Sequence, residues 1–578
     1  MSAGAPAGGL RRAAPIAGVV LLALFAYGNS LSGPLVFDDL RNIRDNAAIR
    51  DLSTFLGPVG YRLYPNRFVG YLTFALNHAV GGNRPAGYHA VNLAIHLANA
   101  LLVYALAMLA TAAPALSRSR AAPLRRPLAF TAAALFATHP LGTQAVTYVV
   151  QRLTSLATMF YLASAVLYLS WRLRREESGR GGALRYLGVL ALSLLAVRTK
   201  EIAFTLPLAL VLLEWTLFPG GGFRRLLPVV PVGLVALLIP LTLVDFSAAG
   251  AATAGSAEGI TRLKTDLGRL DYLRTQAVVV VEYLRLLAWP SGQSLDHDVA
   301  VQRSLAPRVL AGAGFLSGLA ILAVALSRRA APGAGRRPLD PAWRLVSLGL
   351  GWFLLTVLVE SSVIPIVDLM YEHRAYLPSV GILLAFSALL ALAAQRVAPA
   401  GAARVVTLAG LALALVLASL TLARNAVWQS EVALWADAAS KAPAKMRPHL
   451  NLGSALVAAR RLDEGVAALR RAVELDPSAA PARLALGTAL HRTGRLAEAE
   501  ASYREALRLA PGDPQARFNL AELLWSQGRR SEAVPLYREF LERAGPAESA
   551  LRGVANARLA SAGAAGGSPS LPEGRPAR

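Results

Sequence analysis

Long apolar runs recur along roughly the first 425 residues of the chain, separated by short polar stretches. A helix needs about 20 consecutive apolar residues to cross a bilayer. The pattern therefore predicts about eleven membrane spans: 15–32, 88–111, 128–147, 153–171, 184–199, 202–218, 226–244, 308–326, 345–364, 376–395 and 404–422. The apolar stretch 272–290 is left out because Glu282 and Arg285 lie near its middle, and central charges are costly in lipid. We expect it to be interfacial or re-entrant on the outer side.

Arginines alternate with the predicted spans. They follow the second, fourth, sixth, eighth and tenth spans, and Arg11 and Arg12 precede the first. Basic loops remain in the cytoplasm, so we expect the N-terminus inside and the C-terminal region outside. No convincing small-residue cleavage site follows the first span, so we interpret it as a retained helix instead of a signal peptide. The chain is expected to be an integral membrane protein of a bacterial inner membrane.

After residue 425 the chain becomes polar and repetitive. Leu452-Gly453, Leu486-Gly487 and Leu520-Ala521 are spaced 34 residues apart. A period of 34 with helical patterning is the tetratricopeptide signature. The fold class expected is all-α, a polytopic membrane bundle (1–425) followed by about three repeats (426–545) on the outer side. The tail 546–578 is rich in Gly, Ser and Pro, and we expect it to be disordered.

The composition supports a membrane protein. Hydrophobic residues make up 55% and charged residues 16% of the chain, whereas soluble domains carry about 25% charged residues. A net charge of +24 would suggest nucleic acid in a soluble protein, but the cytoplasmic loops account for much of it, and we expect no nucleic-acid partner. The absence of cysteine excludes disulfides, thiolate metal sites and cysteine nucleophiles. No dense set of oxygen ligands is evident, so no metal or other cofactor is expected.

Two motifs on the predicted outer side suggest chemistry. Asp38 and Asp39 lie just beyond the first span, where repulsion should raise one pKa and suit that group to act as a general base. The alternative is an ordinary helix cap or turn. Lys200 stands between the fifth and sixth spans, against the positive-inside bias. It needs an anionic partner, and the candidates are Glu201 and a lipid-linked phosphate.

Further polar groups converge on the same face. The second span carries Tyr88-His89-x-x-Asn92-x-x-x-His96-x-x-Asn99, a spacing that places these side chains on one side of a helix. They could form a site or hydrogen-bond between helices. The remaining outer-side candidates are His139, Arg152, Asp296, His297, Glu372, His373 and Arg374. Titratable groups from separate segments that meet on one face favour a functional site.

The ordered motifs resemble a known family. The chain reads FDD, GYHAVNLAIHLANALLVY, THPLGTQAVTYVVQR, TKE, LDHD and YEHRAYLPSVG, followed by tetratricopeptide repeats. This order resembles the transmembrane and tetratricopeptide-repeat O-mannosyltransferases (TMTC-type proteins) and their bacterial relatives, members of the GT-C glycosyltransferase superfamily. The resemblance covers about residues 15–545. The stretch 61–67 departs from the Tyr-Arg-Pro-Leu that is more usual in relatives, so no role is carried over to Arg62 or Arg67.

The resemblance implies a GT-C-like fold and a transferase that moves a sugar, expected to be mannose, from a polyprenyl-phosphate donor to a protein hydroxyl on the periplasmic side. It implies that Asp38 is the base, Asp39 orients it, and three cations contact the donor phosphate: Lys200, Arg152 and Arg374. The residues expected to shape the sugar and acceptor pocket are His89, Asn92, His96, His139, Glu201, Asp296, His297, Glu372 and His373. The concave face of the repeats would hold the protein or peptide acceptor.

Two readings of another class compete with a transferase. A non-catalytic, membrane-anchored tetratricopeptide scaffold for envelope assembly accounts for the repeats but not for the outer-face motifs at Asp38, Lys200 and Glu201. A transporter is disfavoured because alternating-access sites lie near the bilayer midplane, whereas these motifs lie at one face.

Overall fold

The computed structural model describes residues 6–220, 222–243, 267–331, 338–361, 365–545 and 548–565. Within these ranges the regular secondary structure is helical throughout, which confirms the all-α class. The chain divides into two compact units, Met1–Ser430 and Glu431–Arg578.

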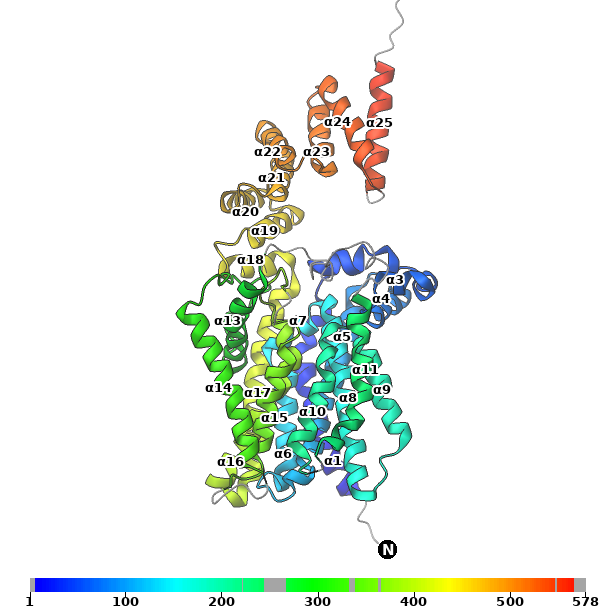
Figure 1. Ribbon diagram of the computed structural model, residues 1–578. Coiled ribbons are helices and arrows are strands. Elements are labelled where there is room, and N and C mark those ends of the chain that lie inside the picture. The colour runs from blue at the N-terminus through cyan, green and yellow to red at the C-terminus, as the bar shows by residue number, and fades with distance from the viewer. Residues whose placement is uncertain are drawn as a thin grey trace, which may run out of the picture. The chain divides into compact units, whose positions relative to one another are not determined.

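The first unit is a bundle of long helices. Figure 1 shows α5, α8, α10, α15 and α17 running roughly parallel to one another. Their buried faces share one large apolar core with α1, α6 and α16. The helices of this unit are α1 (Pro6–Tyr27), α2 (Leu52–Thr54), α3 (Gly60–Leu63), α4 (Phe68–Gly81), α5 (Pro85–Thr111), α6 (Arg125–Thr138), α7 (Thr143–Val146), α8 (Arg152–Ser178), α9 (Ala183–Val197), α10 (Leu206–Leu217), α11 (Val230–Ala236), α12 (Leu238–Leu243), α13 (Arg269–Ala288), α14 (Pro307–Arg329), α15 (Trp343–Val357), α16 (Tyr376–Val397) and α17 (Ala402–Ala426).

Local chemistry sets several helix ends. Helices α5 and α14 begin at Pro85 and Pro307, where a proline is favourable because the first turn does not use its missing N–H. Helix α8 ends before Gly179, which has a φ of +71°. A left-handed residue of this kind closes a helix, and glycine adopts it without steric cost.

In the described part of the chain, seven helical segments are long and apolar enough to cross a membrane. They are Ala13–Ser32, Pro85–Thr111, Val149–Ser178, Gly222–Leu241, Pro307–Arg329, Glu372–Val397 and Pro399–Gln429. Two shorter apolar helices are Ala183–Val197 and Trp343–Val357. The protein is therefore an integral membrane protein and contacts the lipid bilayer. The expected spans 226–244 and 345–364 extend to residues 244 and 362–364, which lie outside the described residues.

One expected span is shorter than its apolar pattern. The prediction of a continuous span over 128–147 is wrong, because α6 ends at Thr138. Pro140 follows at once, and proline disfavours a helical conformation in the residue before it. The ring of His139 then accepts a hydrogen bond from the Leu141 backbone N–H (3.2 Å), so the chain turns through a short 3₁₀ segment. Helix α13, which covers most of 272–290, is not among the seven segments long and apolar enough to cross a membrane.

The second unit is a series of paired antiparallel helices. They are α18 (Glu431–Lys441), α19 (Met446–Ala458), α20 (Leu462–Leu475), α21 (Ala480–Arg492), α22 (Leu496–Leu509), α23 (Pro514–Ser526), α24 (Arg530–Arg543) and α25 (Ser549–Ala565). A Cβ at Gly453 would lie 2.5 Å from Leu469 of the paired helix, and one at Gly487 would lie 2.7 Å from Tyr503. The repeated Leu-Gly pairs therefore permit close helix packing within each repeat.

The tail differs from the expectation. The prediction of disorder from residue 546 is wrong for Ser549–Ala565, which form α25. Ala555 is fully buried, Leu551 and Leu559 pack against the apolar core of the repeats, and Arg558 pairs with Glu522. The small residues that suggested disorder here allow a helix to cover the end of the last repeat. Residues 566–578 lie outside the described residues.

Candidate active site

The first loop is fastened to the bundle by Asp39. This side chain is fully buried. One carboxylate oxygen accepts the Val36 backbone N–H (3.1 Å), and the other accepts the Val150 backbone N–H (2.7 Å) just before α8. Phe37, next to the pair of acids, has a φ of +50°. A bulky residue rarely adopts this conformation, and such positions cluster at functional sites.

One pKa of the acid pair is raised, as expected, but the main cause differs from the expected repulsion between the two carboxylates. The pKa of Asp39 is raised to about 7. Its main cause is burial, partly offset by the backbone hydrogen bonds, and the charge of Asp38 contributes least. The raised pKa therefore belongs to the acid that holds the loop, and repulsion between the two carboxylates is a minor cause. Asp39 is placed to position its neighbour.

Replacing Asp39 with Asn should lower stability. The amide has one acceptor oxygen where the carboxylate has two, so one buried backbone N–H loses its partner at a cost of about 1–3 kcal/mol. The wild-type free energy of unfolding should also fall as the pH rises from about 4 to about 7, because native Asp39 keeps a proton that the unfolded chain has released. Asn cannot titrate, so melting curves of the two proteins across this pH range should differ in slope. Parallel curves would contradict this account.

Asp38 is partly exposed and lies among hydroxyl and amide groups. Its backbone N–H donates to the Tyr148 hydroxyl (3.1 Å), and its carbonyl accepts from the Asn42 amide (2.8 Å). Asn42 in turn accepts from the Tyr71 hydroxyl (2.7 Å). Burial, followed by the charges of Asp38 and Asp39, raises the pKa of Tyr148 well above its usual value. Tyr148 is therefore a neutral hydroxyl beside the Asp38 side chain.

The partner of Lys200 is a residue that the sequence did not indicate. The Lys200 ammonium lies 2.8 Å from a carboxylate oxygen of Glu360 and donates to the Thr154 hydroxyl (2.9 Å). Glu201 pairs instead with Arg67, at 3.1 Å. Of the two candidate partners considered for Lys200, Glu201 is therefore not the ion-pair partner in the structure. Neighbours in sequence point apart here, because Lys200 has an extended backbone just before the short 3₁₀ helix that starts at Glu201.

Arg374 and His373 belong to the same charged cluster. His373 interacts electrostatically with Lys200, and Arg374 interacts with Glu360. The Arg374 guanidinium lies 5.7 Å from the centre of the Tyr371 ring, and the His373 ring stacks on the same tyrosine at 5.2 Å. Tyr371 and Tyr148 interact electrostatically as well. The structure thus joins Lys200 and Arg374 to the surroundings of Asp38.

Arg152 is placed differently. It is fully buried, and its guanidinium donates to the Asn92 side chain (2.7 Å), the Tyr88 carbonyl (3.0 Å) and the Thr73 carbonyl (3.2 Å). It also lies 4.6 Å from the centre of the Phe74 ring. These contacts join α4, α5 and α8. Arg152 therefore holds helices together, and its placement does not support the expected contact with a donor phosphate.

The histidines of the second and third expected spans also join separate segments of the bundle. His89 bonds the Gly33 carbonyl (3.0 Å), and His139 bonds the Leu287 carbonyl (3.0 Å). His96 bonds the Tyr376 hydroxyl (2.7 Å) and the Ala137 carbonyl (3.1 Å). Asn99 donates to the Ser155 carbonyl (2.8 Å). Of the two alternatives left open by the sequence, the geometry favours hydrogen bonding between helices.

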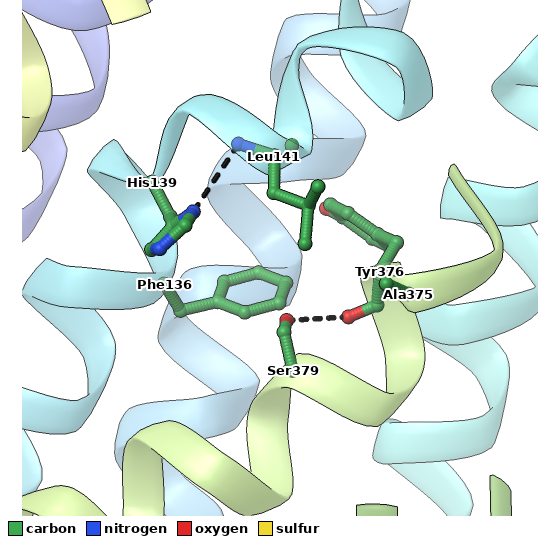
Figure 2. A pocket seen from close by; sticks show the side chains of 7 residues that line it. Phe136, His139, Leu141, Ala375, Tyr376 and Ser379 are labelled. Atoms are coloured by element: carbon green, nitrogen blue, oxygen red, sulfur yellow. Dashed lines mark hydrogen bonds between the residues drawn. The ribbon is translucent and has the colours of Figure 1, made fainter. Parts of the chain in front are cut away.

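A small cavity beside His139 is too small for a sugar. Figure 2 shows Phe136, His139, Leu141, Tyr376 and Ser379 around it. Its volume is about 10 Å³, no more than a single water requires.

Glu372 fastens an outer loop. It is buried and accepts from the Ser294 backbone N–H (2.7 Å), the Gln293 side chain (2.9 Å) and the His297 ring (3.0 Å). Asp296 of the same loop is also buried. These expected pocket residues therefore order the loop next to Arg374. A role in contacting sugar remains a prediction for them.

Comparison with known proteins supports the resemblance. The Tetratricopeptide repeat family matches residues 450–514 and 490–551. Protein O-mannosyl-transferase Tmtc3 of Drosophila melanogaster is 35% identical over 171 residues, which are 26% of this chain and 18% of that protein. Human TMTC4, of the same description, is 30% identical over 199 residues (32% and 27%). Drosophila Tmtc1 is 33% identical over 208 residues (33% and 22%).

These matches confirm the resemblance to the TMTC-type proteins. The matched segments span about a fifth to a quarter of the length of these curated relatives. Among solved structures, yeast Tom70 aligns with 74% of this chain and 96% of its own at 14% identity, with a TM-score of 0.23. A score this low carries no argument about the fold.

Proposed function

We propose that this chain, a membrane protein similar to the TMTC-type protein O-mannosyl-transferases, moves mannose from a polyprenyl-phosphate donor to a hydroxyl of a protein acceptor on the periplasmic side of the membrane. The observation that carries the proposal is the link from a partly exposed acid, Asp38, through Tyr148 and Tyr371 to the cluster that contains Lys200 and Arg374. A base beside phosphate-binding cations is the set of groups that such a transfer needs.

In the proposed step Asp38 accepts the proton of the acceptor hydroxyl as its oxygen attacks C1 of the sugar. The bond from C1 to the phosphate oxygen breaks, and that oxygen keeps the electron pair, so C1 is inverted. Lys200 and Arg374 stabilise the charge that develops on the lipid phosphate. Tyr148 and Asn42 hold the backbone of Asp38, which fixes the height of the base relative to C1.

A groove in the bundle supports a lipid-linked donor. It has a volume of about 970 Å³ and lies among α10, α13, α14 and α15, of which α13–α15 are seen in green in Figure 1. Most of its lining is apolar, including Leu273, Val309 and Leu354, and it reaches Gln276 and Ser361. Ser361 adjoins Glu360, the partner of Lys200. We propose that the polyprenyl tail lies in this groove with its phosphate near Lys200.

Donor choice tests the proposed reaction directly. The purified full chain, in lipid nanodiscs, is given radiolabelled mannose either as polyprenyl-phosphate mannose or as GDP-mannose, with a Ser/Thr-rich acceptor protein. We expect label to enter the acceptor from the polyprenyl donor alone. Transfer from GDP-mannose, or release of free mannose with no acceptor product, would contradict the proposal.

The proposed sidedness places the N-terminus inside and the repeats outside. The chain has no native cysteine, so single cysteines can be introduced at exposed sites. Ala501→Cys in α22 should react with a membrane-impermeant maleimide added to spheroplasts. The control Ser117→Cys, in an Arg-rich loop, should react only after the membrane is opened. The reverse labelling pattern would overturn the orientation.

We propose that the repeats hold the protein acceptor, since tetratricopeptide stacks present extended concave surfaces to other chains. A scaffold without catalysis is the alternative. It uses the repeats in the same way but gives no reason for a partly exposed acid and a buried Lys200–Glu360 pair in the same membrane unit.

A further inference from the structure

We propose that Glu360 is an internal competitor for the lipid phosphate. Its carboxylate neutralises Lys200 before the donor binds, leaves when the phosphate arrives, and returns as the product departs. The inference rests on the proposed function, since it assumes that Lys200 receives the phosphate. It assigns a role to a residue that lies outside every motif recognised in the sequence.

The pair is close and sheltered. The Lys200 ammonium and the Glu360 carboxylate are 2.8 Å apart, and their side chains are 8% and 16% exposed. A contact of this length between charged groups is a strong hydrogen bond, and the low exposure weakens screening by salt. Any other anion must compete with this carboxylate for Lys200.

A carboxylate and a phosphate cannot share one ammonium at low cost. Two anions within about 4–6 Å repel, and each disfavours the charged form of the other. Lys200 already donates to Thr154 and Glu360, which leaves only one of its three N–H donors for a second anion. Binding of the phosphate therefore requires that Glu360 moves away.

The surroundings of Glu360 allow its side chain to move while the backbone remains fixed. The backbone carbonyl of Glu360 accepts a hydrogen bond from the Tyr272 hydroxyl of α13 (2.7 Å). Rotation of the side chain leaves this bond intact. Arg374 and Arg67 both interact electrostatically with Glu360, so a released carboxylate remains close to positive charge.

The position of Glu360 matches the route of the donor. Ser361, the next residue, lines the apolar groove, and so does Gln276, which follows Tyr272, the residue bonded to the Glu360 carbonyl, by one helical turn. Both side chains are buried. A lipid whose tail lies in the groove would present its phosphate beside Glu360. The exchange of anions at Lys200 would then occur where the groove meets the charged cluster.

The exchange matters most for the product. The donor is a phosphodiester with one negative charge. After transfer the lipid carries a phosphomonoester, whose charge is about −1.5 to −2 at neutral pH. The product should therefore hold Lys200 more tightly than the donor does. When Glu360 pairs with Lys200 again, it competes with the product phosphate and so favours release of the product.

Binding of farnesyl phosphate tests the inference without any transfer reaction. This short isoprenoid phosphomonoester is titrated into the purified full chain by calorimetry, with farnesol as the probe that lacks phosphate. Glu360→Gln should bind farnesyl phosphate about tenfold more tightly than the wild type, the order expected when a charged competitor is removed. Farnesol should bind both proteins equally. Glu282→Gln, which removes an acid paired with Arg285 on α13, is the matched control and should behave as the wild type.

The outcomes separate this inference from the proposed function. Lys200→Ala should weaken farnesyl phosphate binding. If it does, but Glu360→Gln binds this ligand no more tightly than the wild type does, the competitor role of Glu360 is wrong and Lys200 still belongs to the phosphate site. If neither variant changes the affinity, the phosphate site itself is wrong. Glu360→Asp keeps the charge but shortens its reach, so it should tighten binding less than Gln does. If Glu360→Gln does not elute as a folded protein in size-exclusion chromatography, the affinity of Glu360→Asp for farnesyl phosphate tests the inference instead.

Discussion

Asp38→Asn is expected to transfer mannose at no more than about one hundredth of the wild-type rate, because loss of a general base lowers rates by about 10²–10⁴. The amide keeps the size of the side chain but cannot accept the acceptor's proton. Initial rates at saturating donor, measured on protein matched for its folded fraction, give the comparison. The scaffold alternative predicts that cells carrying this variant keep full function.

The structure shows why this variant should still fold. Asp38 bonds Tyr148 and Asn42 through its backbone N–H and carbonyl, which the substitution leaves in place, and an Asn oxygen can still accept from the Tyr148 hydroxyl that neighbours the Asp38 side chain. Asp39 is the matched control, since its carboxylate makes the buried bonds. Asp39→Asn should therefore lose more stability and less of the transfer rate. Normal transfer by Asp38→Asn would place the base elsewhere.

Lys200→Ala is expected to weaken binding of polyprenyl-phosphate mannose by about 10- to 150-fold, the range for loss of a hydrogen bond between charged groups. Lys200 is buried and paired with Glu360, and the residue after Glu360, Ser361, lines the groove. Affinity for the acceptor protein should change much less, because the acceptor does not carry the phosphate.

A lysine in the other unit provides the control for this measurement. Lys441 pairs with Asp437 in α18, so Lys441→Ala also removes an ion-paired lysine. Its donor affinity should equal that of the wild type. An unchanged donor affinity in Lys200→Ala would remove Lys200 from the phosphate site.

Local patterns predicted much of the fold. The apolar runs indicated membrane helices, and the regular spacing between Gly453 and Gly487 indicated the repeats. Both patterns depend on residues that are close together in the sequence. The first helix after the repeats was missed. Its small residues also suit a disordered tail, and only the contacts of Ala555 and Arg558 with the last repeat make it a helix.

The sequence predicted which residues belong to the site better than it predicted which residues they contact. The sequence singled out Lys200 but could not identify Glu360, which lies far along the chain and outside any motif. It grouped Arg152 with the phosphate-binding cations, yet burial among Asn92, Tyr88 and Thr73 gives that guanidinium internal acceptors. Which side of a helix faces a site depends on packing between distant segments, and spacing alone does not determine it.

Mass-spectrometric mapping of acceptor proteins tests the central claim most directly. Cells that lack the native chain are supplied with either the wild type or Asp38→Asn at equal abundance in the membrane, and hexose-modified Ser and Thr residues of their periplasmic proteins are compared. The proposed function predicts a set of O-mannosylated sites that is present with the wild type and lost with Asp38→Asn. Identical sets of modified sites in the two strains would contradict it.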